Sequence, residues 1–306
     1  MDQEPKQATG EMPAATRPKR DLMWGALVLL LLVCVGGLWR WWKPGDDVPG
    51  QMKPDRVLRI GYAVEAPYAF LKPDGRVSGE GPEIARVIAA RLGKRVEWRL
   101  TEFGSLIDGL EAGRYDVIAA ARFITPERSG RVRFSRPTFQ AGPALLVRKG
   151  NPLGLHSFQD LAQHTNARVA VLNHSVEQAL VRRAGCRDSR VIVVPDALSG
   201  LAAVQRGQAE ALALSAPAVR WMSRPPNSES VEAAEPFEAG AGTPAGAWSL
   251  GGFVFRKDQR DLLKAWDAAL AGYIGSAEHC RLMRGFGFSA AELPPRLTHE
   301  PNQASP

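Results

Sequence analysis

VLRIGYAVEAPYAFLKPDGRVSGEGPEIARVIAARLGKRVEWRL, residues 57–100, decides the fold of this chain. The apolar run at 57–62 predicts a buried strand, the apolar spacing at 81–93 predicts an amphipathic helix, and residues 95–100 predict a second strand. A strand, a helix and a second strand in this order are typical of a mostly parallel α/β sheet.

The same alternation continues along the chain. It is carried by a helix near 105–112 and a strand at 116–120, and then by strands at 167–172, 190–195 and 209–214 that alternate with helices at 175–185 and 197–207. Residues 223–246 are rich in Pro, Ser, Gly and Ala and predict an irregular loop without a core of its own. Both halves of the chain are therefore expected to form α/β structure.

Two short motifs, APYAF at 66–70 and FITPER at 123–128, each follow a predicted strand. In open α/β sheets, ligands bind outside the carboxyl ends of the strands, so both motifs should face one crevice. There they bring together aromatic faces, a carboxylate and an arginine. This combination predicts a pocket for a small molecule.

Composition narrows the class of protein. The chain has 306 residues, of which 45% are apolar, and this is enough to bury sizeable cores. The net charge is +7, but no basic stripe with interleaved aromatic residues concentrates it, so we expect no nucleic-acid partner. The sequence has no Cys/His metal spacing, no glycine-rich phosphate loop and no nucleophile elbow, and we expect no cofactor and no metal.

The N-terminal apolar segment at 23–39 has a length at the lower end of the range that spans a bilayer. Basic residues precede it, and tryptophans, which are enriched at membrane boundaries, lie at both of its ends. No small-residue cleavage site is evident, and Val33 does not fit the position before a lipidated Cys34. We therefore expect a cytoplasmic segment at 1–22, an uncleaved transmembrane anchor at 23–42 in the inner membrane, a linker at 43–54 and a binding domain outside the cytoplasm.

Several longer blocks resemble one family. These blocks are GYAVEAPYAF, GEGPEIARVIAARLG, TEFGSLIDGLEAGRYDVIAAARFITPERSGRVRFSRPTF, LLVRKGNP, GGFVFRKDQRDLL and GSAEHCRLMRGFGFSAAELP. Together they resemble the bacterial extracellular solute-binding proteins that bind polar amino acids, over roughly residues 55–300. EAPYAF, TEFGSLI and FITPER are most similar to the ectoine-binding components of ABC importers.

The resemblance implies a type II periplasmic binding protein of the Venus-flytrap kind, whose two α/β lobes close on a ligand. Lobe 1 would comprise residues 55–147 and 250–300, and lobe 2 residues 148–249 with the crossing strands, before a tail at 301–306. ABC permease subunits would be the protein partner. Cys186 and Cys280 would fall in different lobes, and we expect two free thiols because a disulfide would oppose lobe movement.

The resemblance also implies roles for residues of FITPER and APYAF. Arg128 would grip a ligand carboxylate through a bidentate pair, although a surface arginine in the Glu127 turn is the alternative. Phe123 stands where many amino-acid binders carry Ser or Thr, and its ring could stack on a delocalised cation. Tyr68 and Phe103 match aromatic pocket positions of the family, with ordinary core packing as the alternative.

Polar positions complete the expected site. Glu65 could pair with ligand N–H groups, and Ser215 stands where α-amino-acid binders usually carry an aspartate for the ammonium group. Ser175 matches a carboxylate contact of lobe 2, or it is a plain helix N-cap. These residues favour a cyclic amidinium that carries a carboxylate, as in ectoine, although Arg122 adds a second guanidinium that could favour a more acidic solute.

Two other functions stay open. Some proteins of this fold are dehydratases of cyclohexadienyl substrates, and Glu65 would then be a general acid. No second catalytic group stands out, so we expect no enzyme. A membrane-tethered ligand-sensing domain is the other alternative, and the apolar N-terminal segment favours it.

Overall fold

The computed structural model describes residues 57–238 and 249–295, which belong to one compact unit at 52–306. The predicted anchor at 23–42 lies outside the described residues, as do the segments predicted at 1–22, 43–54 and 301–306. Within the two described ranges, no helix combines the length and the apolar character needed to cross a membrane.

The first lobe contains the N-terminal part of this unit and the segment after residue 251. Its elements are β1 (Leu58–Tyr62), β2 (Phe70–Leu71), β3 (Val77–Ser78), α2 (Glu80–Arg91), β4 (Val96–Leu100), the 3₁₀ helix η1 (Phe103–Ser105), α3 (Leu106–Glu111), β5 (Val117–Ile118), α4 (Pro126–Ser129), β6 (Arg133–Phe134), β14 (Val254–Phe255), α9 (Arg260–Ala271), α10 (Ala277–Gly285) and the 3₁₀ helix η4 (Ala290–Glu292). The five-stranded sheet has the order β4-β1-β5-β14-β6. β1 is parallel to β4 and β5, whereas β14 is antiparallel to β5 and β6.

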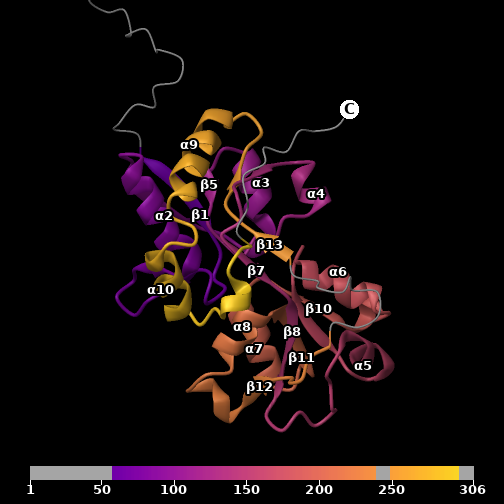
Figure 1. Ribbon diagram of the computed structural model, residues 1–306. Coiled ribbons are helices and arrows are strands. Elements are labelled where there is room, and N and C mark those ends of the chain that lie inside the picture. Colours follow the sequence, from indigo (N-terminus) through magenta and orange to yellow (C-terminus); the bar gives the residue numbers. More distant parts are fainter. Residues whose placement is uncertain (1–56, 239–248, 296–306) are drawn as a thin grey trace, which may run out of the picture. The chain divides into compact units, whose positions relative to one another are not determined.

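Helix α2 covers one face of this sheet because its apolar residues recur on one side. Ile84 and Ile88 lie four positions apart, and both are buried against Ile60 of β1 and Trp266 of α9. α9 lies beside α2, and α3 packs against β1 and β5 (Figure 1). Gly93 follows α2 with φ of 64°, a conformation that glycine adopts without strain, and the chain then turns into β4.

The second lobe has a sheet of its own. Its elements are β8 (Pro143–Arg148), α5 (Phe158–Gln163), β9 (Val169–Leu172), α6 (Val176–Arg183), the 3₁₀ helix η2 (Asp188–Arg190), β10 (Val191–Val194), α7 (Ala197–Gln205), β11 (Ala211–Ser215), α8 (Ala216–Met222), the 3₁₀ helix η3 (Asn227–Glu229) and β12 (Val231–Ala233). The strand order is β10-β9-β11-β8-β12. β9 is parallel to β10 and β11, and β8 is antiparallel to β11 and β12.

Strand β11 has helices on both of its faces, and its side chains alternate between them. Leu212 and Leu214 pack on the side of α7 and α8, while Ala211 and Ala213 pack on the side of α5 and α6. Each of these four side chains is buried. A strand that is covered on both faces has to be apolar throughout, which explains the unbroken run in the sequence.

Strands β7 (Phe139–Ala141) and β13 (Ser249–Gly251) pair antiparallel and connect the two lobes (Figure 1). Phe139 faces Gly251 across this pair, and a Cβ atom at Gly251 would lie 2.0 Å from the Phe139 ring. Glycine is therefore required at this crossing. The two-lobed α/β fold with crossing strands, predicted from the sequence, is confirmed.

The C-terminal segment touches both lobes. Arg220 of α8 donates to the buried carboxylate of Glu292 in η4, with distances of 2.7 and 2.5 Å from Nη2 to the two oxygens. Phe70 of the first lobe stacks at 5.4 Å on Trp221 of α8 and at 6.2 Å on Phe286. These contacts join the lobes on the side of α8 and α10.

Two predictions about lobe 2 differ from the structure. Residues 143–147 were expected in lobe 1, but β8 is an inner strand of the second sheet. The predicted irregular loop at 223–246 is wrong for Val231–Ala233, which form β12 beside β8. Both pairings are antiparallel and long-range, so the local sequence pattern does not reveal them.

Cys186 is buried, Cys280 is partly exposed, and both are free thiols.

Removal of the Trp266 side chain tests the core of the first lobe. The indole is fully buried and stacks on Phe253 and Phe255 at 5.1 and 5.8 Å. Trp266→Ala should lower the free energy of unfolding by about 3–5 kcal/mol, because it leaves a cavity among aromatic rings. Leu198→Ala, on the exposed surface of α7, should change it by no more than about 0.5 kcal/mol in the same urea titrations. Equal losses in both variants would contradict this packing.

Candidate functional site

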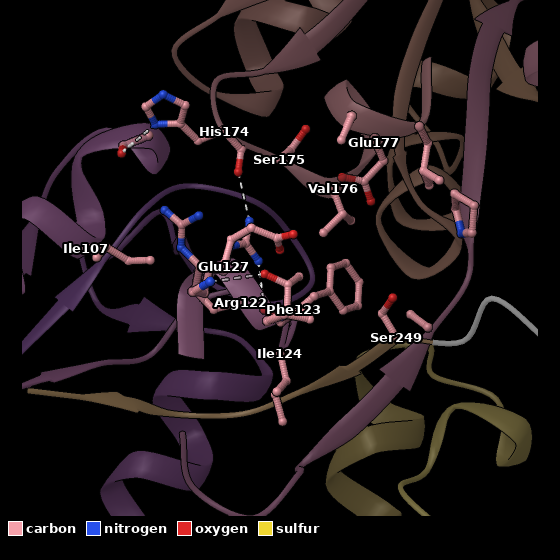
Figure 2. A pocket seen from close by; sticks show the side chains of 18 of the residues that line it. Ile107, Arg122, Phe123, Ile124, Glu127, His174, Ser175, Val176, Glu177 and Ser249 are labelled. Atoms are coloured by element: carbon pink, nitrogen blue, oxygen red, sulfur yellow. Dashed lines mark hydrogen bonds between the residues drawn. The ribbon is translucent and has the colours of Figure 1, made fainter. Parts of the chain in front are cut away.

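A cavity of about 860 Å³ lies between the lobes, at the ends of strands from both sheets. Its walls include the segment from Arg122 to Arg128 in the first lobe and the start of α6, Ser175 to Glu177, in the second (Figure 2). Figure 2 shows Phe123, Ile124 and Glu127 facing Ser175, Val176 and Glu177 across the cavity. The motif FITPER therefore borders the cavity, whereas APYAF, predicted to face the same crevice, contributes none of its lining residues.

Local sequence explains how Arg128 comes to lie at this position. Thr125 is the N-cap of α4, and its side-chain oxygen accepts a hydrogen bond from the backbone N–H of Arg128 at 3.3 Å. Pro126 occupies the first turn, where its missing N–H costs nothing. Arg128 is thus fixed one turn after the cap, and only 9% of it is exposed.

The guanidinium of Arg128 connects the two lobes. Nη1 donates to the carbonyl of Phe123 and Nη2 donates to the carbonyl of His174, each at 2.8 Å. His174 has φ of 57°, a left-handed conformation that is uncommon outside glycine, and it thereby presents its carbonyl to Arg128. Burial lowers the pKa of Arg128, and the nearby Glu177 opposes this shift.

Ser175 and Glu177 begin helix α6. Ser175 is its N-cap and accepts from the backbone N–H of Gln178 at 3.0 Å, so it has the structural role that was one of its two predicted alternatives. Glu177 is buried, and desolvation raises its pKa to about 7, against the opposing effect of hydrogen bonding at the helix start and of Arg128. Sequence analysis missed Glu177 as a site residue. The sequence signal that could have identified it is a carboxylate in the first turn of a helix that follows an inner strand.

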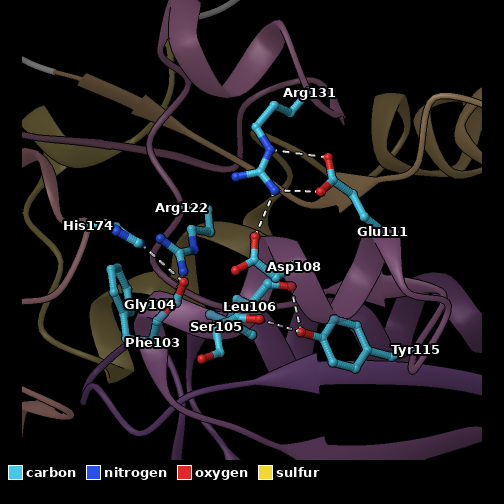
Figure 3. Close-up of polar contacts among 10 residues, drawn as sticks. All are labelled: Phe103, Gly104, Ser105, Leu106, Asp108, Glu111, Tyr115, Arg122, Arg131 and His174. Carbon is cyan, nitrogen blue, oxygen red and sulfur yellow. Dashed lines mark hydrogen bonds and ion pairs between the residues drawn. The ribbon is translucent and has the colours of Figure 1, made fainter.

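Phe103 and Arg122 form a second feature beside the cavity (Figure 3). The Arg122 guanidinium lies over the Phe103 ring, with 3.9 Å between Cζ and the ring centroid. Its Nη2 donates to the Phe103 carbonyl. Burial lowers the pKa of Arg122 to about 9, and the charge of Arg128 adds to this shift.

Glu65 is a buried carboxyl group in the turn after β1. It is 5% exposed, and its Oε2 has no hydrogen-bond partner in the described part of the chain. Desolvation and the neighbouring Glu177 raise its pKa to about 8, while Arg122 and Arg128 act in the opposite direction. Two carboxyl groups and two guanidinium groups from both lobes are thus close enough to influence one another.

Tyr68 and Ser215 form a hydrogen bond between the lobes. The Tyr68 hydroxyl and Ser215 Oγ lie 2.9 Å apart, and both residues are buried. The Tyr68 ring packs on Phe139 at 4.8 Å and on Phe288 at 5.4 Å. Burial raises the pKa of Tyr68 well above its usual value.

The predicted site residues therefore fall into two groups. Phe123, Arg128 and Ser175 line the cavity, whereas the remaining members are buried and do not line it: Glu65, Tyr68, Phe103 and Ser215. In residues 57–238 and 249–295, no cluster of His, Cys, Asp and Glu side chains is arranged to hold a metal ion. The arrangement suits recognition of a small charged molecule by hydrogen bonds and aromatic contacts.

A two-lobed α/β fold with a charged cavity between its lobes is the architecture of a solute-binding protein. The family model of the bacterial extracellular solute-binding proteins, family 3, matches residues 58–287. The chain belongs to this family. Its binding domain is accordingly extracytoplasmic.

Relatives and solved structures agree with this family. A probable amino-acid ABC transporter periplasmic-binding protein of Sinorhizobium fredii is 31% identical over 256 residues, which cover 82% of this chain and 84% of the relative. The crystal structure of EhuB in complex with hydroxyectoine is similar with a TM-score of 0.68 and 36% identity, over 76% of this chain and 89% of EhuB. An ancestral arginine-binding protein bound to glutamine is similar with a TM-score of 0.67 and 25% identity, over 78% of this chain and 99% of that protein.

These comparisons also concern the enzyme alternative. One similar structure is an ancestral amino-acid-binding protein described as a precursor of cyclohexadienyl dehydratase. It is 23% identical with a TM-score of 0.65, over 75% of this chain and 95% of that protein. At this identity the likeness shows the fold alone. The family model and the Sinorhizobium fredii relative both describe binding proteins, which does not favour the enzyme alternative. The chain is a solute-binding protein of this family.

The raised pKa of Glu65 makes stability depend on pH. The native state keeps this proton up to about pH 8, whereas the unfolded chain releases it near the ordinary value of 4.5. Stability from this group should therefore fall as pH rises from about 5 to 8, by up to roughly 1.4 kcal/mol per pH unit. Glu65→Gln should reduce the slope in urea titrations across the range, with a remainder from Glu80 and Glu177, whose pKa values burial raises to about 7. Glu229→Gln, on the exposed surface, should keep the full slope. A wild-type slope that persists in Glu65→Gln would contradict the assignment.

Proposed function

We propose that this chain captures a small zwitterion between its two lobes and that Arg128 binds the carboxylate of this ligand. The proposal rests on the burial and the hydrogen-bond partners of the Arg128 guanidinium. It is almost fully buried, it lines the cavity, and its hydrogen bonds at 2.8 Å go to two neutral carbonyl groups, one from each lobe.

A carboxylate is a better partner for this guanidinium than a backbone carbonyl. Charge-assisted hydrogen bonds are roughly twice as strong as neutral ones, and a bidentate pair also fixes the orientation of the bound group. Because one of the present acceptors is the His174 carbonyl of lobe 2, exchange of that carbonyl for a ligand carboxylate would couple binding to the contact between the lobes. A carboxylate between α4 and α6 would thus connect both lobes.

The class of ligand follows from the groups around Arg128. Glu177, which lines the cavity, offers an acceptor for ligand N–H groups, and Phe123 presents an aromatic face to the cavity. Ectoine, hydroxyectoine and amino acids all carry a carboxylate together with a nitrogen cation. The likeness to EhuB, whose crystal structure contains hydroxyectoine, supports this class at 36% identity.

Substitution of Arg128 tests the carboxylate contact. Arg128→Ala should weaken binding of the best ligand from a calorimetric screen of ectoine, hydroxyectoine and amino acids by roughly 2–5 kcal/mol, because a desolvated carboxylate is left unpaired. Arg128→Lys should recover only part of this loss, since an ammonium group cannot reproduce the planar fork.

Two controls accompany this substitution. Arg168→Ala, which removes an exposed arginine paired with Glu210 in the second lobe, should bind as the wild type does. Thermal unfolding of each variant without ligand reports any loss of stability that arises because the Arg128 contact with His174 is missing. An Arg128→Ala protein with near-native affinity would remove Arg128 from the binding site.

We also propose that an uncleaved helix at 23–42 anchors the domain in the inner membrane, with residues 1–22 in the cytoplasm. The apolar length and the flanking tryptophans of this segment support the proposal. The binding domain would then work close to the permease that receives its ligand.

Fractionation of the native host tests this anchor. The protein should remain in the membrane fraction after a wash with high salt, because burial of an apolar helix is insensitive to ionic strength. N-terminal sequencing should recover residues before 23. A soluble mature chain that begins after the apolar segment would contradict the anchor.

A further inference from the structure

Arg122 is a buried charge that the contacts described above leave incompletely bonded. Only 1% of the residue is exposed, although it lines the cavity with its neighbour Phe123. Nη2 donates to the Phe103 carbonyl, but Nε has no hydrogen-bond partner in the part of the chain that the structure describes. A buried guanidinium donor without an acceptor is costly, which makes a further partner at this position favourable.

The position of the Arg122 guanidinium also limits what a ligand can do there. It stacks on the Phe103 ring, with Cζ 3.9 Å from the ring centroid. Figure 3 shows Arg122 and Phe103 close to His174. An aromatic face that holds a guanidinium of the protein is not free to hold a delocalised cation of the ligand. The subsite next to Phe103 therefore presents positive charge.

Within the described residues, the Arg122 guanidinium forms no ion pair or hydrogen bond with a carboxylate. Arg128 is close enough to lower the pKa of Arg122, and both guanidinium groups keep their charge at pH 7. Glu65 and Glu177 are the buried carboxyl groups that influence Arg128, and burial raises the pKa of Glu65 to about 8 and of Glu177 to about 7. Burial thus makes Glu65 and Glu177 weaker counter-charges for the two guanidinium groups, while the exposed carboxylates of Asp108 and Glu127 also act on Arg122 and Arg128 respectively.

We propose that the ligand carries a second acidic group, which pairs with Arg122 while its α-carboxylate pairs with Arg128. This inference rests on the function proposed above and narrows it from zwitterions in general to acidic zwitterions, such as amino acids with a side-chain carboxylate. Two carboxylates would supply one partner to each buried guanidinium, including an acceptor for Arg122 Nε. The ligand nitrogen would then be directed toward Glu177, which lines the cavity.

A ligand without the second acid fits these groups less well. A neutral zwitterion such as ectoine or glutamine compensates Arg128 through its carboxylate but leaves the Arg122 charge buried beside it. Its own cation would also add positive charge to a site that already holds the guanidinium groups of Arg122 and Arg128. Both the unpaired Arg122 charge and the added ligand cation oppose binding, since like charges in a desolvated site repel strongly.

Calorimetric titration of the full chain in detergent separates the two classes. The probes are L-glutamate and L-aspartate, with L-glutamine and L-asparagine as matched amides of the same shape, and ectoine as the cyclic cation. We expect at least one acid to bind about tenfold or more tightly than its own amide and than ectoine.

Variants connect this preference to Arg122. Arg122→Met keeps the length of the side chain and its contact with Phe103 but removes the charge, and it should abolish the preference of acid over amide. Arg122→Lys should keep part of the preference. Arg168→Gln, on the exposed surface, should leave it unchanged, and thermal unfolding without ligand identifies any variant that fails to fold.

The wild-type comparison is sufficient to overturn the inference even where a variant does not fold. Equal or tighter binding of an amide or of ectoine would contradict the second acidic group, and the proposed capture of a zwitterion would survive. A preference for the acid that persists in a folded Arg122→Met protein would remove Arg122 from the explanation. Binding of none of the five probes would contradict the inference and the proposed function together.

Discussion

The structure depends on the burial of charge between two lobes. Arg122, Arg128, Glu65 and Glu177 are each at least nine-tenths buried, and they influence one another's pKa values across the junction. Such groups are costly to remove from water unless each has a partner. Arg128 satisfies this constraint with a carbonyl from each lobe, so the contact between the lobes and the binding cavity share the same atoms.

Sheet topology explains why these four residues meet. Glu65 follows β1, Arg122 and Arg128 follow β5, and Glu177 lies in the first turn of the helix that follows β9. Each of these strands has parallel neighbours in its own sheet, and the carboxyl ends of such strands form the edge at which α/β proteins bind ligands. The crossing strands β7 and β13 then bring the two edges together. The order of the strands thus determines which charged groups meet at the cavity.

Local patterns in the sequence were sufficient for much of this architecture. The strand around Ile60 and the helix around Ile84 follow from the spacing of apolar side chains, and the structure confirms them. The position of β8 and the existence of β12 depend on antiparallel partners far away in sequence, and local patterns do not reveal them. The stacking of Arg122 on Phe103 and the burial of Glu177 likewise depend on how distant segments pack. For this reason the sequence predicted FITPER near a pocket and noted the second guanidinium of Arg122, but it did not reveal that this guanidinium is buried on Phe103 with an unpartnered Nε in the described part of the chain.

The contact between Arg128 and a ligand carboxylate is the central claim, and a crystal structure of the chain with its tightest-binding zwitterion tests it most directly. We expect the ligand carboxylate to lie in the cavity between α4 and α6, within about 3 Å of both terminal nitrogens of Arg128, as in a bidentate charge-assisted pair. The His174 carbonyl should no longer accept from Nη2. A ligand bound elsewhere, or an Arg128 guanidinium that stays on the carbonyls of Phe123 and His174 while the ligand occupies the cavity, would contradict it.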